Sequence, residues 1–125
     1  MIRFDGFVPG RHQLDAFGGG GFRFAGMGHR GSVLATPAGI RIWPVTRFSE
    51  ITPETLQPVL DEAEQIDFLL IGTGTDIVFI PHAWRRLLSE RGVTVEGMAT
   101  GAAARTYNVL VGEDRRVAAA LIAVD

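Results

Sequence analysis

The sequence contains no cysteine, and this absence removes several kinds of protein at once. Without thiols there is no disulfide framework, no thiolate nucleophile and no cysteine ligand for zinc or an iron–sulfur cluster. Charge is also sparse, because 21% of the residues are charged and the formal net charge is -2. The basic residues are scattered and form no stripe, so we expect no nucleic-acid partner.

Long apolar runs are missing as well. Stretches such as 68–75 and 117–124 are far shorter than the roughly 20 residues that span a bilayer, so we expect no transmembrane segment. Residues 1–10 carry charges at Arg3 and Asp5 and match neither a secretory signal nor an Arg-rich transit peptide. This pattern predicts a cytoplasmic protein.

Apolar residues are abundant overall, at 46% of a chain of 125 residues. A chain of this length buries roughly two-thirds of its unfolded surface, which suits one core better than two. The apolar content is also enough to offset the conformational entropy lost on folding. We therefore predict a single domain over residues 1–125.

The first 47 residues are rich in glycine and indicate short strands joined by turns. Phe22 and Phe24 are two residues apart, so they lie on one face of a strand. Segments 32–36 and 40–43 flank Pro37-Ala38-Gly39, where proline presets φ and glycine permits a positive φ. This pattern predicts a hairpin, and hence a β-rich N-terminal portion.

Three helical segments are expected in the remainder. Proline at 58 would break a helix begun at 53, so we predict a turn over 53–56 and a helix over 58–65. Pro81 opens a second helix, with Ala83, Trp84, Leu87 and Leu88 on one arc. The third helix, over 101–112, is preceded by a threonine, Thr100, which we expect to cap it.

Three strands alternate with these helices. Segment 68–71 is a continuous apolar run, which indicates a strand covered on both faces, and 93–98 is a second strand. Segment 117–124 contains no polar residue at all, so neither of its faces is solvated. We predict that this last strand lies in the middle of the sheet of a layered α/β fold.

Gly72-Thr73-Gly74-Thr75 directly follows a buried strand and is the sharpest local feature. Small residues at the carboxyl end of a strand let backbone N–H groups approach an anion. Isoleucine at 77 replaces the third glycine of a dinucleotide fingerprint, and Ile77-Val78-Phe79-Ile80 follows in place of a helix. The segment is therefore either a structural turn or a ligand-binding loop.

A polar cleft is conceivable beside this loop. If strands 68–71 and 93–98 are parallel neighbours, the helix N-terminus at Thr100 shares one sheet edge with residues 72–75. The residues that would bind a ligand there are Gly72, Thr73, Gly74, Thr100, Arg105 and Asn108. The alternative is that Thr100 is only a cap, and that Arg105 and Asn108 form a solvated helix face.

No catalytic set is recognisable. His12, His29 and His82 lack the spacing of metal ligands, and no Ser–His–acid order can be argued from position. We predict no metal, no cofactor and no catalytic residue. The turn at 113–116 indicates a local charge cluster, and the glycine run at 18–21 indicates a mobile hairpin loop.

Several motifs together resemble one known family. They are Gly31-Ser32, Trp43, Leu70-Ile71-Gly72-Thr73-Gly74, Pro81, Thr100-Gly101-Ala102-Ala103, Arg105-Thr106-Tyr107-Asn108 and the segment 115–122. The chain is similar over nearly its whole length to the small-domain family of unknown function that includes mitochondrial complex I assembly factor three. We expect it to lack the targeting extension of the mitochondrial branch.

The resemblance implies a three-layer α/β fold with flanking helices. Its central mixed sheet would have five strands, the last one central and antiparallel to its neighbours. No catalytic residues are established for the family, and its mitochondrial branch assists assembly of a membrane respiratory complex. We therefore expect an interaction or assembly factor with a protein partner, and a homodimer through a sheet edge or apolar patch is plausible.

The alternative is a small-molecule or anion-binding enzyme that uses the cleft near 72–75 and 100–108.

Overall fold

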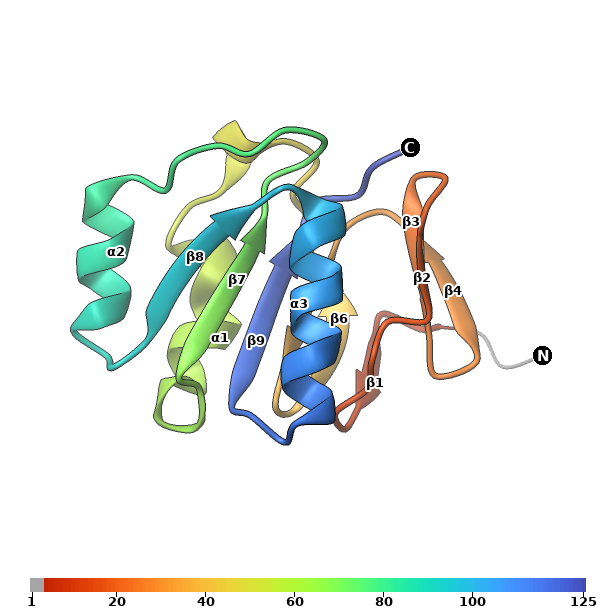
Figure 1. Ribbon diagram of the computed structural model, residues 1–125, viewed down its shortest axis with the longest axis horizontal. Coiled ribbons are helices and arrows are strands. Elements are labelled where there is room, and N and C mark those ends of the chain that lie inside the picture. Colours follow the sequence, from red (N-terminus) through yellow and green to blue (C-terminus); the bar gives the residue numbers. More distant parts are fainter. Residues whose placement is uncertain (1–3) are drawn as a thin grey trace.

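The computed structural model describes residues 4–125 and contains two sheets (Figure 1). The large sheet has the strand order β1-β6-β5-β9-β7-β8. Its strands are β1 (Phe7–Pro9), β5 (Val33–Thr36), β6 (Gly39–Ile42), β7 (Phe68–Gly72), β8 (Thr94–Met98) and β9 (Val117–Leu121). The small sheet is formed by β2 (Ala16–Gly18), β3 (Gly21–Phe24) and β4 (Met27–Arg30).

Three α-helices and three short 3-10 turns complete the fold. They are α1 (Gln57–Asp61), α2 (His82–Ser89), α3 (Thr100–Gly112), η1 (Phe48–Glu50), η2 (Glu54–Leu56) and η3 (Ala63–Gln65). The turn and helix predicted over 53–65 are present, but the helix ends at Asp61 and continues as η3. No helix among residues 4–125 is both long and apolar enough to cross a membrane.

Two cores cover the two faces of the large sheet, which makes the fold three-layered. Figure 1 shows α3 in front of the sheet and α1 behind it. The first core lies on the α1 and α2 side and includes Trp43, Leu69, Ile71 and Leu88. The second lies on the α3 side and includes Phe22, Phe24, Leu70, Ala103 and Tyr107. The small sheet shares this second core with α3, and both phenylalanines of β3 point into it, as their spacing predicted.

The predicted α/β class with a mixed central sheet is confirmed. The sheet has six strands where the resemblance implied five, because β1 pairs with β6 along the outer edge. The hairpin around Pro37 and Ala38 is present as β5 and β6. Residues 1–3 of the predicted 1–125 domain lie outside the described residues.

β9 occupies the centre of the sheet, as its composition predicted. All five of its residues are buried, and alternate side chains enter the two cores. β9 runs antiparallel to β5 but parallel to β7, so the implied antiparallel pairing on both sides is wrong. The reason is that α3 connects β8 to β9, and such a crossover helix returns the chain in the same direction.

Candidate functional site

The loop after β7 and the N-terminus of α3 meet at one edge of the sheet. β7 and β8 are parallel neighbours, so their carboxyl ends lie side by side, which meets the condition that the sequence left open. The Thr73 N–H donates to the Met98 carbonyl at 2.8 Å, and the Thr100 N–H donates to the Gly74 carbonyl at 2.8 Å. The two segments therefore contact each other directly through their backbones.

Gly72 permits this close approach. A Cβ atom at position 72 would lie 2.9 Å from Cδ2 of Leu121 and 3.0 Å from Oγ1 of Thr100. Contacts this short are not found for real Cβ atoms, so only glycine fits without displacing its neighbours. The glycine at the end of β7 is thus required by packing between α3 and the sheet.

Thr100 lies inside this junction and does not cap α3. Its side chain is completely buried, and its hydroxyl donates to the Ile122 carbonyl at 2.7 Å and accepts the Gly74 N–H at 3.0 Å. Ala99 occupies the cap position. The expected cap is therefore wrong, because the hydroxyl points inward to two backbone groups that would otherwise be buried without partners.

Thr73 also turns its hydroxyl toward the backbone. Its Oγ1 lies 2.6 Å from the carbonyl oxygen of Asp76 and accepts the Val78 N–H at 3.2 Å. Thr73 is buried, so this hydroxyl fixes the direction in which the chain leaves β7. Gly74 and Thr100 therefore pair with each other, and the remaining polar groups of Thr73 and Thr100 pair with the backbone of neighbouring segments.

Arg105 and Asn108 were predicted for the same cleft, but they lie further along α3 and contact other parts of the chain. Arg105 is exposed and places its guanidinium 5.3 Å from the centre of the Phe17 ring. Asn108 pairs with the backbone of Leu14, accepting from its N–H and donating to its carbonyl, each at 2.7 Å. Asn108 is thus not part of a solvated face. Ligand binding by Gly72–Gly74, Thr100, Arg105 and Asn108 stays a prediction.

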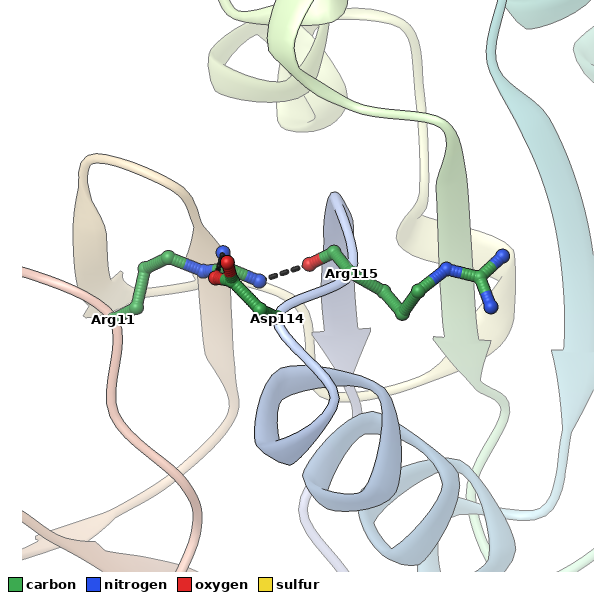
Figure 2. Close-up of polar contacts among 3 residues, drawn as sticks. All are labelled: Arg11, Asp114 and Arg115. Carbon is green, nitrogen blue, oxygen red and sulfur yellow. Dashed lines mark hydrogen bonds and ion pairs between the residues drawn. The ribbon is translucent and has the colours of Figure 1, made fainter.

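The Asn108 contact belongs to a longer attachment of residues 11–14 along α3. Gln13 donates to the Asn108 carbonyl at 2.8 Å, and the Tyr107 hydroxyl donates to the His12 carbonyl at 3.0 Å. Figure 2 shows Arg11 at the far end, where it pairs with Asp114 at 3.2 Å and donates to the Arg115 carbonyl. Four consecutive residues therefore fasten the N-terminal segment to the helix.

Burial changes the acidity of Tyr107. Its side chain lies in the second core, and desolvation raises the pKa of its phenol to about 12, a rise that the nearby Arg11 partly opposes. The phenol therefore stays protonated and keeps donating to the His12 carbonyl throughout the neutral range.

Three consecutive exposed apolar residues follow the Gly-Thr loop (residues 72–75), and two of them, Ile77 and Phe79, are the most exposed large apolar side chains among residues 4–125. Ile77, Val78 and Phe79 are 63%, 38% and 91% exposed. No sequence motif marks these three residues as a surface. The available signal was a run of apolar residues that is neither strand nor helix, between a polar turn and Pro81. We call residues 77–79 the apolar tip.

The apolar tip is held in place from both sides. On one side the Thr73 hydroxyl accepts the Val78 N–H, and on the other Ile80 is buried against Gly97 of β8. Arg85 of α2 donates to the Val95 carbonyl at 2.9 Å and so joins α2 to the same strand. A hollow of about 140 Å³ lies between the tip, α2 and β8. The surface is therefore built on fixed elements.

The remaining polar candidates are local. Arg116 lies 3.7 Å from Asp67, and the Arg115 guanidinium lies 5.5 Å from the centre of the Phe68 ring, so both arginines contact the start of β7. A charge cluster within residues 113–116 stays a prediction. Among residues 4–125, no three His, Asp or Glu side chains gather as a metal ion requires.

A family description, "Protein of unknown function (DUF498/DUF598)", matches residues 14–122. This chain belongs to that family. A family relative from Rhodobacter capsulatus, described as uncharacterized, is 41% identical over 119 residues, which cover 95% of this chain and 87% of the relative. NADH dehydrogenase (ubiquinone) 1 alpha subcomplex assembly factor 3 of Xenopus tropicalis is 30% identical over 109 residues, or 87% of this chain. The match covers 60% of the Xenopus protein's length.

Solved structures of bacterial proteins share the fold of this chain. The crystal structure of a protein from Bartonella henselae, titled an outer membrane protein, matches with a TM-score of 0.89 and 50% identity, over 94% of this chain and 98% of that one. The solution structure of a Bordetella pertussis protein, described as a Mth938-like domain, matches with a TM-score of 0.79 and 31% identity. That match covers 90% of this chain and 85% of the other. The layered arrangement described above is thus the arrangement of these relatives.

Proposed function

We propose that this chain is an assembly factor that binds a protein partner, and that the partner belongs to a membrane respiratory complex or a similar assembly. The similarity to assembly factor 3 of Xenopus supports the process. The observation that carries the binding role is the apolar tip, above all the 91% exposure of Phe79. A cytoplasmic location is part of this proposal.

An exposed phenylalanine on a fixed loop is suited to protein recognition. Burying its ring against a partner would contribute about 1.5–3 kcal/mol, and aromatic anchors of this kind dominate many interfaces. The tip adds Ile77 and Val78 to the same surface, and the hollow beside it accepts an apolar side chain from the partner. Residues 77–79 are already ordered by Thr73 and Ile80, so binding would cost little further entropy.

The alternative, a small-molecule or anion-binding enzyme, has less support. An anion at the strand ends could not use the Gly74 and Thr100 N–H groups, because these already donate to each other's segments. Thermal-shift screening against nucleotides, phosphosugars and acyl-CoA compounds tests it. Stabilisation that disappears in Arg105→Ala would favour the enzyme over the assembly factor.

Deletion of the gene in its own organism tests the assembly role. We expect less assembled NADH dehydrogenase complex on native gels, restored by the wild-type chain and by Val109→Ser, which alters an exposed apolar residue on α3. Phe79→Ser should restore far less. Unchanged complex levels after deletion would contradict the assembly role, and full restoration by Phe79→Ser would contradict the role of the tip.

Both edges of the large sheet are poorly suited to pairing with a strand of a second copy of this chain. β1 places Pro9, which has no N–H, on the outer edge strand, and this blunts pairing with another strand. At the other edge, Arg85 occupies the Val95 carbonyl. If the chain dimerises, we propose the apolar tip as the contact; sedimentation of Phe79→Ser beside wild type tests this.

A further inference from the structure

The small sheet has one open edge, at β4. β3 and β4 are joined by the two-residue turn Ala25-Gly26, in which both residues have positive φ. The Gly31 N–H donates to the Gly20 carbonyl at 2.7 Å, so alternate residues of β4, His29 among them, turn their backbone groups toward β3. Gly28 and Arg30 therefore turn theirs away from it.

No described element covers these outward groups. Among residues 4–125, the backbone N–H and carbonyl groups of Gly28 and Arg30 have no partner beyond β4 itself. The opposite edge of the small sheet, β2, faces α3, where the Phe17 ring packs against Gly101. Figure 1 shows β4 on the side of the small sheet that is remote from α3. β4 is thus an uncovered strand edge.

The outer face of the small sheet is almost bare of side chains. The pairing register places six residues on it, which are Ala16, Gly18, Gly21, Arg23, Gly28 and Arg30. Four of these are glycine or alanine, so the surface between the arginines is mainly backbone. A hollow of about 240 Å³ lies over this face. The face is open to a flat or extended ligand.

Arg23 and Arg30 supply the only charges on this face. They lie on adjacent strands, since Arg23 is opposite Gly28 and Arg30 is opposite Gly21, and both are exposed. Neither forms an ion pair with any residue from 4 to 125. Diagonal neighbours on paired strands are close enough to act on one extended ligand.

We propose that β4 receives an extended acidic peptide segment of the partner protein as a fourth strand of the small sheet. Gly28 and Arg30 each present an unused donor and an unused acceptor, and a peptide backbone satisfies both, whereas a fully ionised phosphate group has only acceptors. The acidic side chains meet Arg23 and Arg30 over the glycine floor. A second copy of this chain fits less well, because it would bring further arginines to the same face as Arg23 and Arg30. This inference rests on the proposed binding function and adds a second surface to the apolar tip.

The test uses the full chain and a defined probe, an acetylated and amidated octapeptide that alternates Asp and Val. In ¹⁵N NMR titrations we expect the amide protons of Gly28 and Arg30 to exchange at least tenfold more slowly with peptide bound. The amide of His29 faces β3 and should change least. The control ligands are the same peptide with Lys in place of Asp, and inorganic pyrophosphate; neither should protect these amides.

Matched variants separate the contributions of charge and backbone. R23E/R30E should weaken peptide binding at least tenfold, whereas R91E, which reverses another exposed arginine without an ion pair, should leave it unchanged. G28P removes one outward N–H at a position where a Cβ meets nothing within 4 Å, and should weaken binding without loss of fold. Unfolding of G28P would leave R23E/R30E as the deciding variant.

Three results would overturn the inference. They are equal peptide affinity in wild type and R23E/R30E, unprotected Gly28 and Arg30 amides in the peptide complex, and pyrophosphate binding that is as tight as peptide binding and lost in R23E/R30E. The last result would assign a small-anion site. Because the titration needs no respiratory complex, its failure leaves the gene-deletion test standing, and failure of the deletion test leaves peptide binding standing.

Discussion

Two neighbouring regions at the end of β7 differ in which side chains they bury. They are the junction of Thr73 and Thr100, and the apolar tip at residues 77–79. At the strand end, Thr73 is buried and Thr100 is wholly enclosed, and their hydroxyls bond to backbone groups. A few residues later, Ile77 and Phe79 are exposed to water. The first region is a junction that stabilises the fold, and the second is an exposed apolar surface, which we propose as a binding site for a partner.

Because of this difference, variants of the junction and variants of the apolar tip should change different properties of the protein. Breaking the junction should unfold or loosen the protein whatever its partner, because buried backbone groups lose their bonds. Altering the tip should leave the fold intact and remove binding. The four predictions below run from the largest expected effect on stability to the smallest.

Thr100→Val should have the largest effect. Valine matches threonine in shape but leaves the Gly74 N–H and the Ile122 carbonyl buried without a partner, at a cost of about 2–4 kcal/mol. Urea unfolding at neutral pH measures it. Thr100→Ser keeps the hydroxyl and should lose only about 1 kcal/mol. Equal losses in the two variants would show that the hydroxyl does not hold the junction.

Gly72→Ala should come next. Its new methyl group would overlap Leu121 and Thr100, and overpacking of this kind costs about 1–3 kcal/mol. Gly28→Ala is the matched control, since a Cβ there meets nothing within 4 Å, and it should change the free energy of unfolding by less than about 0.5 kcal/mol. Similar values for both variants would mean that α3 moves freely away from the sheet.

A third prediction extends the comparison to Tyr107, another polar group that the fold buries. Its pKa is raised from 10.0 to about 12 in the folded state, so the stabilisation is complete below pH 10 and is lost as pH rises toward 12. We expect wild type to lose about 1.4 kcal/mol more than Tyr107→Phe between neutral pH and about pH 11.

The composition of the chain makes the titration of Tyr107 easy to distinguish from that of other groups. The chain has one tyrosine, no cysteine and no lysine, so few other groups titrate in that range and tyrosinate absorbance reports Tyr107 alone. A titration midpoint near 10 in the folded protein would show that the phenol is hydrated, and would remove its place in the second core.

Phe79→Ser should have the smallest effect on stability. The ring is 91% exposed, so the free energy of unfolding should change by less than about 0.5 kcal/mol. The same variant should nevertheless fail to restore complex assembly in the deletion strain. A loss above about 1 kcal/mol would place the ring in the fold and erase the contrast with Thr100.

The sequence predicted the elements well where composition alone decides burial. Segment 117–124 has no polar residue, so its central position followed directly, and α3 begins within one residue of its predicted start. The sequence left the relative direction of 68–71 and 93–98 open, and the parallel pairing in the structure brings residues 72–75 to the start of α3. Ligand binding at this edge is still a prediction.

The partners of several buried or half-buried polar side chains could not be predicted, because those partners are far away in the sequence. Asn108 bonds to Leu14 across 94 positions, and nothing near either residue predicts the pair. The Thr100 hydroxyl had two suitable partners, its own helix and the end of β9, and only the packing of α3 on the sheet selects the second. Local rules favoured a cap because they consider only nearby backbone.

The amino-acid sequence by itself determined which segments are apolar, where glycine and proline interrupt them, and hence the layered α/β class of this protein. The tertiary structure alone decided that the polar side chain of Thr73 is turned inward and the apolar residues 77–79 outward. The physical reason is that burial depends on what lies across the sheet edge, where α3 closes over Thr73 and Gly74 while no described element covers Phe79.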